Sequence, residues 1–157
     1  EIMLMQGKVA ENKEEARKML DEVVASGKAF ETFKDMVKAQ GGNVDMIENP
    51  ELLPQSKFKT EIKSEESGNV KVLHSERLGV LAMQLGAGRE TKEQDVNHAV
   101  GLELACKRGD KVNKGDTICI VYHDEELKPQ WVDELYHAFE LTNEEVAPQP
   151  IIEKVLS

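Results

Sequence analysis

The first part of the chain carries apolar residues at helical spacing. Asn12 can accept a hydrogen bond as an N-cap, and Glu15, three residues later, completes a capping box. Gly27 can end the helix because glycine adopts the left-handed conformation without strain. The apolar positions between these signals are Ala16, Met19, Leu20, Val23 and Val24. We therefore predict a helix between residues 12 and 27 with one buried face.

A second helix is predicted directly after the first, from about Lys28 to Gln40. Its inward positions are Phe30, Phe33 and Val37, and Gly41-Gly42 ends it. Two consecutive helices of this kind predict a helical hairpin. Asn49-Pro50 and Leu53-Pro54 then interrupt any helix, because proline lacks a backbone donor and restricts the residue before it. We place a domain boundary there, with one domain over 1–55 and another over 56–157.

Short Val- and Ile-rich segments separated by glycine turns dominate the rest of the chain, which is typical of strands. The predicted strands cover 57–64, 69–74, 100–107, 111–113 and 117–122. One helix interrupts them, capped by Ser75 and stopped by Gly86-Ala87-Gly88. The last helix is predicted over 130–141, where Trp131, Leu135 and Phe139 are spaced by four. The predicted fold class is α+β.

Composition excludes several classes of function. The 157 residues carry a net charge of −10, which repels phosphate backbones, and we see no basic stripe that would bind nucleic acid. No apolar run approaches the ~20 residues of a membrane span. Cys106 and Cys119 are predicted to be reduced thiols in a cytoplasmic protein. The chain opens on Glu1, and its first five residues follow a helical pattern without a cap, which favours a fragment of a longer protein.

Candidate catalytic motifs fail on their context. Gly86-Ala87-Gly88-Arg89 has the composition of a phosphate loop, but it closes a helix and lacks the Lys-Ser/Thr of such loops. His123-Asp124 has no Ser or Cys in a nucleophile elbow nearby. The paired acids Glu65-Glu66 and Glu125-Glu126 have no neighbour that would raise one pKa, so we interpret them as surface carboxylates.

Metal, cofactor and stacking sites are also not predicted. The four histidines and two cysteines show no zinc-like pairing, and the aromatic side chains near the end of the chain have the helical spacing of core residues. The sequence therefore predicts no catalytic, phosphate-binding, substrate-binding or metal-binding residue and no cofactor. The residues considered are His74, His98, His123, His137, Cys106, Cys119, Trp131, Tyr136 and Phe139.

The segment from Ser67 to Val121 is similar to a biotinyl or lipoyl carrier in its glycine-turned hairpins, which build a barrel-sandwich hybrid. A carrier also presents its modified lysine on a hairpin between two methionine-like neighbours. The chain has no Met-Lys-Met stretch, and the helix from Ser75 would be an unusual insertion. A stand-alone binding or carrier module of this type stays open as the alternative function.

An ordered set of motifs along the whole chain resembles the pyrimidine-nucleoside phosphorylases, the thymidine phosphorylase family. Each motif is weak alone, but their order and spacing over the chain are specific. They are Ala25-Ser26-Gly27-Lys28-Ala29, Phe33 to Met36 with Val37-Lys38-Ala39-Gln40-Gly41-Gly42, Leu53-Pro54, Arg77-Leu78-Gly79, Leu85-Gly86-Ala87-Gly88-Arg89, Ala99-Val100-Gly101, Gly109-Asp110-Lys111-Val112 and Gly115-Asp116.

The resemblance implies the carboxy-terminal portion of an enzyme that splits a pyrimidine nucleoside with phosphate, giving free base and (deoxy)ribose 1-phosphate. It implies that residues 1–55 are terminal helices of the large α/β lobe and that 56–157 form an α/β-hammerhead domain with barrel-sandwich-like hairpins. The partners implied are the remainder of the phosphorylase chain, in a cytoplasmic homodimer, with both substrates bound outside this segment. Whether such a parent prefers thymidine or uridine stays open.

Two positions depart from the family's pattern. Asn97 stands where the family often has an acid, and Tyr122 with His123 stands where a histidine commonly ends the last hairpin strand. These departures affect the expected equivalence of the hairpin rather than the assignment to the family. From the packed α+β character and the missing reactive groups, we expect the segment to buttress the phosphate-binding lobe during closure of the cleft.

Overall fold

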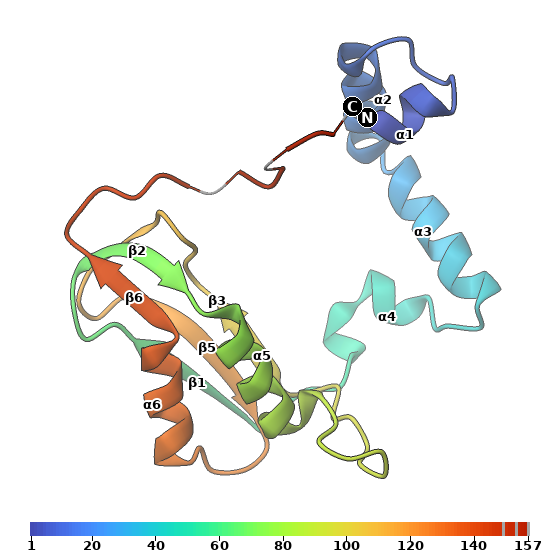
Figure 1. Cartoon of the computed structure of the whole chain (residues 1–157). Helices are drawn as coiled ribbons and strands as arrows, with labels where there is room; N and C mark the ends of the chain where they lie inside the picture. Colours follow the sequence, from blue (N-terminus) through green and yellow to red (C-terminus); the bar gives the residue numbers. More distant parts are fainter. Residues whose placement is uncertain (149, 153, 157) are drawn as a thin grey trace. The chain divides into compact units, whose positions relative to one another are not determined.

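The structure is a computed structural model that describes residues 1–148, 150–152 and 154–156 (Figure 1). The chain divides into two compact units, Glu1–Leu53 and Pro54–Ser157. We call them unit 1 and unit 2. No helix of the described residues is long and apolar enough to cross a membrane.

Unit 1 is entirely helical among its described elements. These are α1 (Ile2–Gln6), α2 (Lys13–Ala25), α3 (Lys28–Ala39), α4 (Asp45–Glu48) and a 3₁₀ turn, η1 (Pro50–Leu52). The first long helix confirms its sequence signals, since the Glu15 backbone N–H donates to Asn12 Oδ1 at 2.9 Å and Gly27 has φ = 77°. The side chain of Glu15 accepts from the backbone N–H of Glu11 at 2.8 Å.

The predicted hairpin with buried faces is wrong for unit 1. Figure 1 shows α3 leading away from the end of α2 rather than folding back along it. Among the described residues of this unit, only Ala10 and Ala16 are buried apolar side chains, whereas Phe30 and Phe33 remain 45% and 43% exposed. Val23 and Val24 of α2 are exposed as well, so neither helix buries these side chains within this unit.

The described residues of unit 2 form two three-stranded antiparallel sheets. One has the order β1-β5-β3 and the other the order β4-β2-β6. The strands are β1 (Phe58–Lys63), β2 (Gly68–Leu73), β3 (Gly101–Leu104), β4 (Lys111–Val112), β5 (Thr117–His123) and β6 (Phe139–Thr142). Strand β5 is central in its sheet, where Val121 pairs with Thr60 on one side and Leu102 on the other. All five predicted strands are therefore confirmed as β1 to β5, with ends that differ by a few residues.

The core of unit 2 draws on both sheets and on the helices α5 (Ser75–Ala82) and α6 (Pro129–His137). Strand β5 contributes Val121 and Cys119, which are fully buried. Helix α6 contributes Trp131 and Leu135, which are 8% and 1% exposed, and Phe139 from β6 is 9% exposed. The interpretation of Trp131 and Phe139 as core residues is confirmed.

The helix predicted to begin with Ser75 as its cap begins one residue earlier. His74 is the N-cap and makes no side-chain cap hydrogen bond, while Ser75 is the first helical residue. A short π-helical turn, η2 (Met83–Ala87), follows α5 and contains Gly86 at φ = 107°. The predicted stop at this glycine is confirmed, because an L side chain rarely adopts that conformation.

The helix predicted to extend to Leu141 ends at His137, so this part of the prediction is wrong. Residues Phe139–Thr142 form β6, which pairs with β2, Leu73 lying opposite Phe139 and Val70 opposite Leu141. Phe139 is buried and Glu140 is exposed, as alternation along a strand requires. The spacing of four from Trp131 to Phe139 concealed this switch of period. The fold is mixed helix and sheet, as the α+β prediction stated.

Candidate functional site

A polar cluster in unit 2 forms where the loop before β3 meets the residue after β5. The Asn97 side-chain amide donates to Asp124 Oδ2 at 2.8 Å, and the backbone N–H of Lys57 donates to Asp124 Oδ1 at 2.7 Å. These donors hold the pKa of the Asp124 carboxyl below its usual range, the Lys57 N–H having the larger effect. The carboxylate therefore stays charged and has a donor on each oxygen.

Asn97 closes the loop that begins at the glycine stop after α5. Its backbone N–H donates to the Gly86 carbonyl at 2.8 Å, and its side-chain oxygen accepts from the Ala99 N–H at 3.0 Å. With the amide bonded to Asp124, this side chain ties both ends of the 86–97 loop to the end of β5. An acid at position 97 would place a second carboxylate beside Asp124, which explains why an amide suits this chain.

His123, the last residue of β5, is 7% exposed and uses both ring nitrogens. Nδ1 lies 2.6 Å from the Glu125 carbonyl oxygen, and Nε2 lies 2.8 Å from Thr60 Oγ1. A carbonyl only accepts, so Nδ1 carries a proton and donates; in the neutral ring, Nε2 then accepts from the Thr60 hydroxyl. The Phe58 ring stacks on the imidazole with a centroid distance of 5.5 Å.

A hollow opens beside His123. Its lining residues are Phe58, Thr60, His123, Glu126, Leu127 and Val132. The Thr60 hydroxyl, the His123 imidazole and the Glu125 carbonyl are arranged in the order of a nucleophile, a base and an orienting group. Such a site also needs donors aimed at a developing oxyanion. None of the hydrogen bonds seen among the described residues places such donors here, so this geometry supports a packed polar contact rather than acyl transfer.

Both cysteines are free thiols buried in the core of unit 2. Burial raises the pKa of Cys106, and burial together with the nearby thiol of Cys106 raises the pKa of Cys119 to about 12. The thiol, not the reactive thiolate, is therefore the form present at neutral pH. The geometry gives these residues the role of small core side chains.

His74, Glu65 and Glu66, which were also candidates from the sequence, make their contacts outside the Asp124 cluster. His74 pairs with Glu140 across the sheet at 2.6 Å, and Glu65 and Glu66 line a hollow with Ser64 and Tyr136. No group of three or more His, Cys, Asp or Glu side chains within the described part of the chain could hold a metal ion. None of these positions combines a nucleophile, a base and an electrophile.

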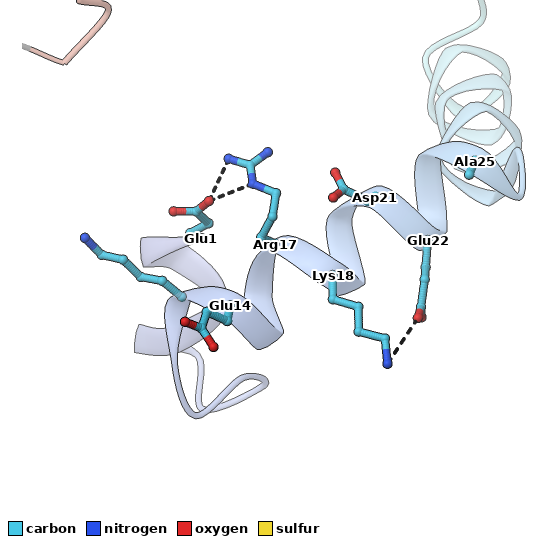
Figure 2. Close-up of a pocket in the computed structure, with 8 residues that line it drawn as sticks. Glu1, Glu14, Arg17, Lys18, Asp21, Glu22 and Ala25 are labelled. Atoms are coloured by element: carbon cyan, nitrogen blue, oxygen red, sulfur yellow. Dashed lines mark hydrogen bonds and ion pairs between the residues drawn. The ribbon is translucent and has the colours of Figure 1, made fainter.

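Unit 1 has a hollow of its own on the surface of α2 (Figure 2). Its lining residues are Glu1, Lys13, Glu14, Arg17, Lys18, Asp21, Glu22 and Ala25. Figure 2 shows the Arg17 guanidinium turned toward Glu1, with Nη2 at 2.6 Å and Nε at 2.7 Å from the same carboxylate oxygen. Lys18 lies 3.9 Å from Glu22 on the same helix. Both of these cations therefore already face carboxylates.

Sequence reasoning singled out the pair His123-Asp124 and, separately, Asn97, and it missed that all three belong to one cluster in unit 2. It also missed Thr60 and the backbone of Lys57. The signals at these positions were the adjacency of His123 and Asp124 and the departures from a family pattern at Asn97 and at Tyr122 with His123. Asp124 contacts Asn97, 27 positions away in the sequence, and Lys57, 67 positions away. Such contacts follow from strand pairing, and no local motif predicts them.

Comparison with known proteins supplies the remaining information. Residues 69–142 match the family described as Pyrimidine nucleoside phosphorylase C-terminal domain. The chain is 38% identical over 149 residues to the pyrimidine-nucleoside phosphorylase of Bacillus subtilis (strain 168), a match that covers 95% of this chain and 34% of the relative. It is 39% identical over 155 residues to the pyrimidine-nucleoside phosphorylase of Staphylococcus aureus (strain USA300), covering 99% of this chain and 36% of the relative.

These matches confirm the resemblance derived from the motifs, which extends from unit 1 through unit 2. The chain spans about a third of the length of the curated relatives it matches.

Proposed function

Because the chain resembles the C-terminal portion of pyrimidine-nucleoside phosphorylases over nearly its whole length, we propose that it is part of such an enzyme. The parent reaction is phosphorolysis, in which a pyrimidine nucleoside and phosphate give the free base and (deoxy)ribose 1-phosphate. The observation that carries this proposal is the 38–39% identity across 95–99% of the chain.

Within that enzyme, we assign this portion a structural role, with catalysis and substrate binding supplied by the remainder of the chain. The polar contacts of unit 2 support this. Asp124 has a donor on each carboxylate oxygen, and both nitrogens of His123 have partners. Among the described residues, no buried side-chain nitrogen or oxygen lacks a hydrogen-bond partner. Such satisfied contacts stabilise a fold, which supports a structural role.

The domain assignment follows from the same proposal. Residues 1–55 are the terminal helices of the α/β phosphate-binding lobe, and 56–157 form the C-terminal hammerhead domain. The packed core of unit 2 suits a rigid body that supports the lobe while the cleft opens and closes. The parent is proposed to be a cytoplasmic homodimer that needs no cofactor from this portion.

Deleting residues 56–157 from the full-length parent tests this role. We expect a loss of phosphorolysis together with a lower melting temperature, because the lobe loses its support. A matched control is the full-length parent with Val80→Ala, a change at a 44% exposed position of α5. A truncated parent with the stability and turnover of the intact enzyme would refute the proposal.

A further inference from the structure

The chain that follows β6 is bound to the outer face of the second sheet. Val70 of β2 is fully buried, and because neighbouring side chains of a strand point to opposite faces, Asn69 and Lys71 lie on the face away from the core. The Asn69 side-chain amide donates to the Glu144 carbonyl at 2.9 Å. The segment directly after β6 therefore contacts the outer face of the neighbouring strand. We call residues 143–148 the strap.

Arg108, in the turn before β4, contacts the far end of the strap. Its Nε donates to the Lys71 carbonyl at 3.1 Å, and its Nη1 donates to the Ala147 carbonyl at 3.4 Å. Strand β4 pairs with β2 only at Gly68 and Asn69, so the guanidinium reaches β2 beyond the end of that pairing. One planar group with donors in a fixed fork thus joins β2 to the strap.

Gly109, next to Arg108, lies directly under the end of the strap. Its φ is 95°, a conformation that L side chains rarely adopt. A Cβ atom at this position would lie 3.1 Å from backbone atoms of Pro148 and 3.1 Å from the Val146 carbonyl oxygen. The absence of a side chain therefore lets the strap approach the turn closely. This contact is independent of the hydrogen bonds made by Arg108.

The strap is fastened by few contacts of low burial. Its side chains are exposed except for that of Val146, which is partly buried. The buried cluster of unit 2 includes no residue of the strap, all six of which the structure describes. A segment held by polar contacts with little apolar burial opens at a lower free energy than a packed core.

We propose that the strap opens and closes while both sheets stay folded, and that Arg108 is the positioning residue that keeps it closed. The closed strap fixes the point at which the end of the chain leaves unit 2. The described apolar side chains beyond it are exposed, namely Ile151, Ile152, Val155 and Leu156. Opening of the strap changes where this apolar end can reach, so the contacts of Arg108 control its position.

Digestion of the full-length protein by a glutamate-specific protease tests this role. The protease cuts after Glu144 and Glu145 in the strap and after Glu103 in β3 of the other sheet, and mass spectrometry identifies each cut. Because cleavage needs an opened segment, its rate reports the open fraction. We expect Arg108→Ala to raise cleavage of the strap about tenfold, since the loss of a hydrogen bond from a charged donor shifts an equilibrium by about this factor. Cleavage after Glu103 should not change. The matched control is Lys111→Ala, at an exposed position of β4, which should alter neither rate.

Gly109→Ala is the second variant, and it should also speed cleavage of the strap, because its methyl group would occupy the space next to Pro148. Cleavage of the strap at the unchanged rate in either variant would overturn the proposal. Cleavage of the strap in the unchanged protein as fast as in a free peptide of residues 140–148 would overturn it too, because no closed strap would then exist. A rise at Glu103 in step with the strap would mean that unit 2 unfolds as a whole, which also contradicts the proposal.

Discussion

Truncation of one buried leucine tests whether the core of unit 2 is what holds it together. Leu135 on α6 is 1% exposed and belongs to the cluster that joins both sheets. The Leu135→Ala substitution removes three buried carbon atoms, each worth about 0.8 kcal/mol of transfer free energy. The cavity left behind adds to this cost, so the free energy of unfolding should fall by about 3 kcal/mol.

Urea unfolding followed by tryptophan fluorescence measures this change. The chain has one tryptophan, Trp131, which is 8% exposed and lies one helical turn before Leu135. With a slope of about 1 to 3 kcal/mol per M, the midpoint should fall by about 1 to 3 M while the slope itself stays the same. Val80→Ala, at a 44% exposed position of α5, is the control and should change the free energy by less than about 0.5 kcal/mol.

A Leu135→Ala variant that unfolds at the same urea concentration as Val80→Ala would refute this reasoning. It would mean that α6 does not pack on the sheets. A changed slope would instead mean that the substitution altered the compactness of the folded or unfolded state.

Three further predictions concern the Asp124 cluster, the thiols of Cys106 and Cys119, and Gly86. Because the pKa of Asp124 is lower in the folded than in the unfolded chain, its charge stabilises the fold above the unfolded pKa, and this contribution is lost as the pH falls through the folded pKa. The free energy of unfolding of Asp124→Asn should therefore lie below that of the unchanged chain at pH 7, and the difference should shrink toward pH 3. A difference independent of pH would contradict this prediction. Cys106 and Cys119 should not react with iodoacetamide at pH 8 until urea unfolds the chain, because burial raises the pKa of both thiols. Mass spectrometry measures the reaction, and modification of either thiol in the folded chain would contradict this prediction. Gly86→Ala should lower the melting temperature and cost at least about 1 kcal/mol, since φ = 107° strains an L side chain, and an unchanged melting curve would show that the turn adapts.

Local signals were sufficient for most of the elements. The Asn12 cap with Glu15, the left-handed Gly27 and the stop at Gly86 act through neighbouring atoms, so the residue types alone predict them. The glycine turns likewise separate strands whose apolar pattern has a period of two. What failed was the stretch from Trp131 to Leu141, where a helix and a strand follow one another and the spacing of four runs across both.

The exposure of the helices in unit 1 and the contacts of the Asp124 cluster could not be predicted, for a different reason. The helical spacing of Phe30 and Phe33 correctly identifies one face, but the pattern does not state whether the surface that covers the face lies in the same segment. The contacts of Asp124 depend on β1, β5 and the 86–97 loop meeting in three dimensions. Such contacts arise from the pairing of distant strands, which a one-dimensional pattern does not encode.

The central proposal is that this chain, as part of a nucleoside phosphorylase, contains no active site of its own. The most direct measurement is phosphorolysis of thymidine and of uridine by the 157-residue chain, with the full-length parent assayed in parallel. We predict release of free base by the parent and none by the chain at any phosphate concentration. Turnover by the chain alone, abolished by His123→Ala but not by Val80→Ala, would contradict the claim and place the chemistry in unit 2.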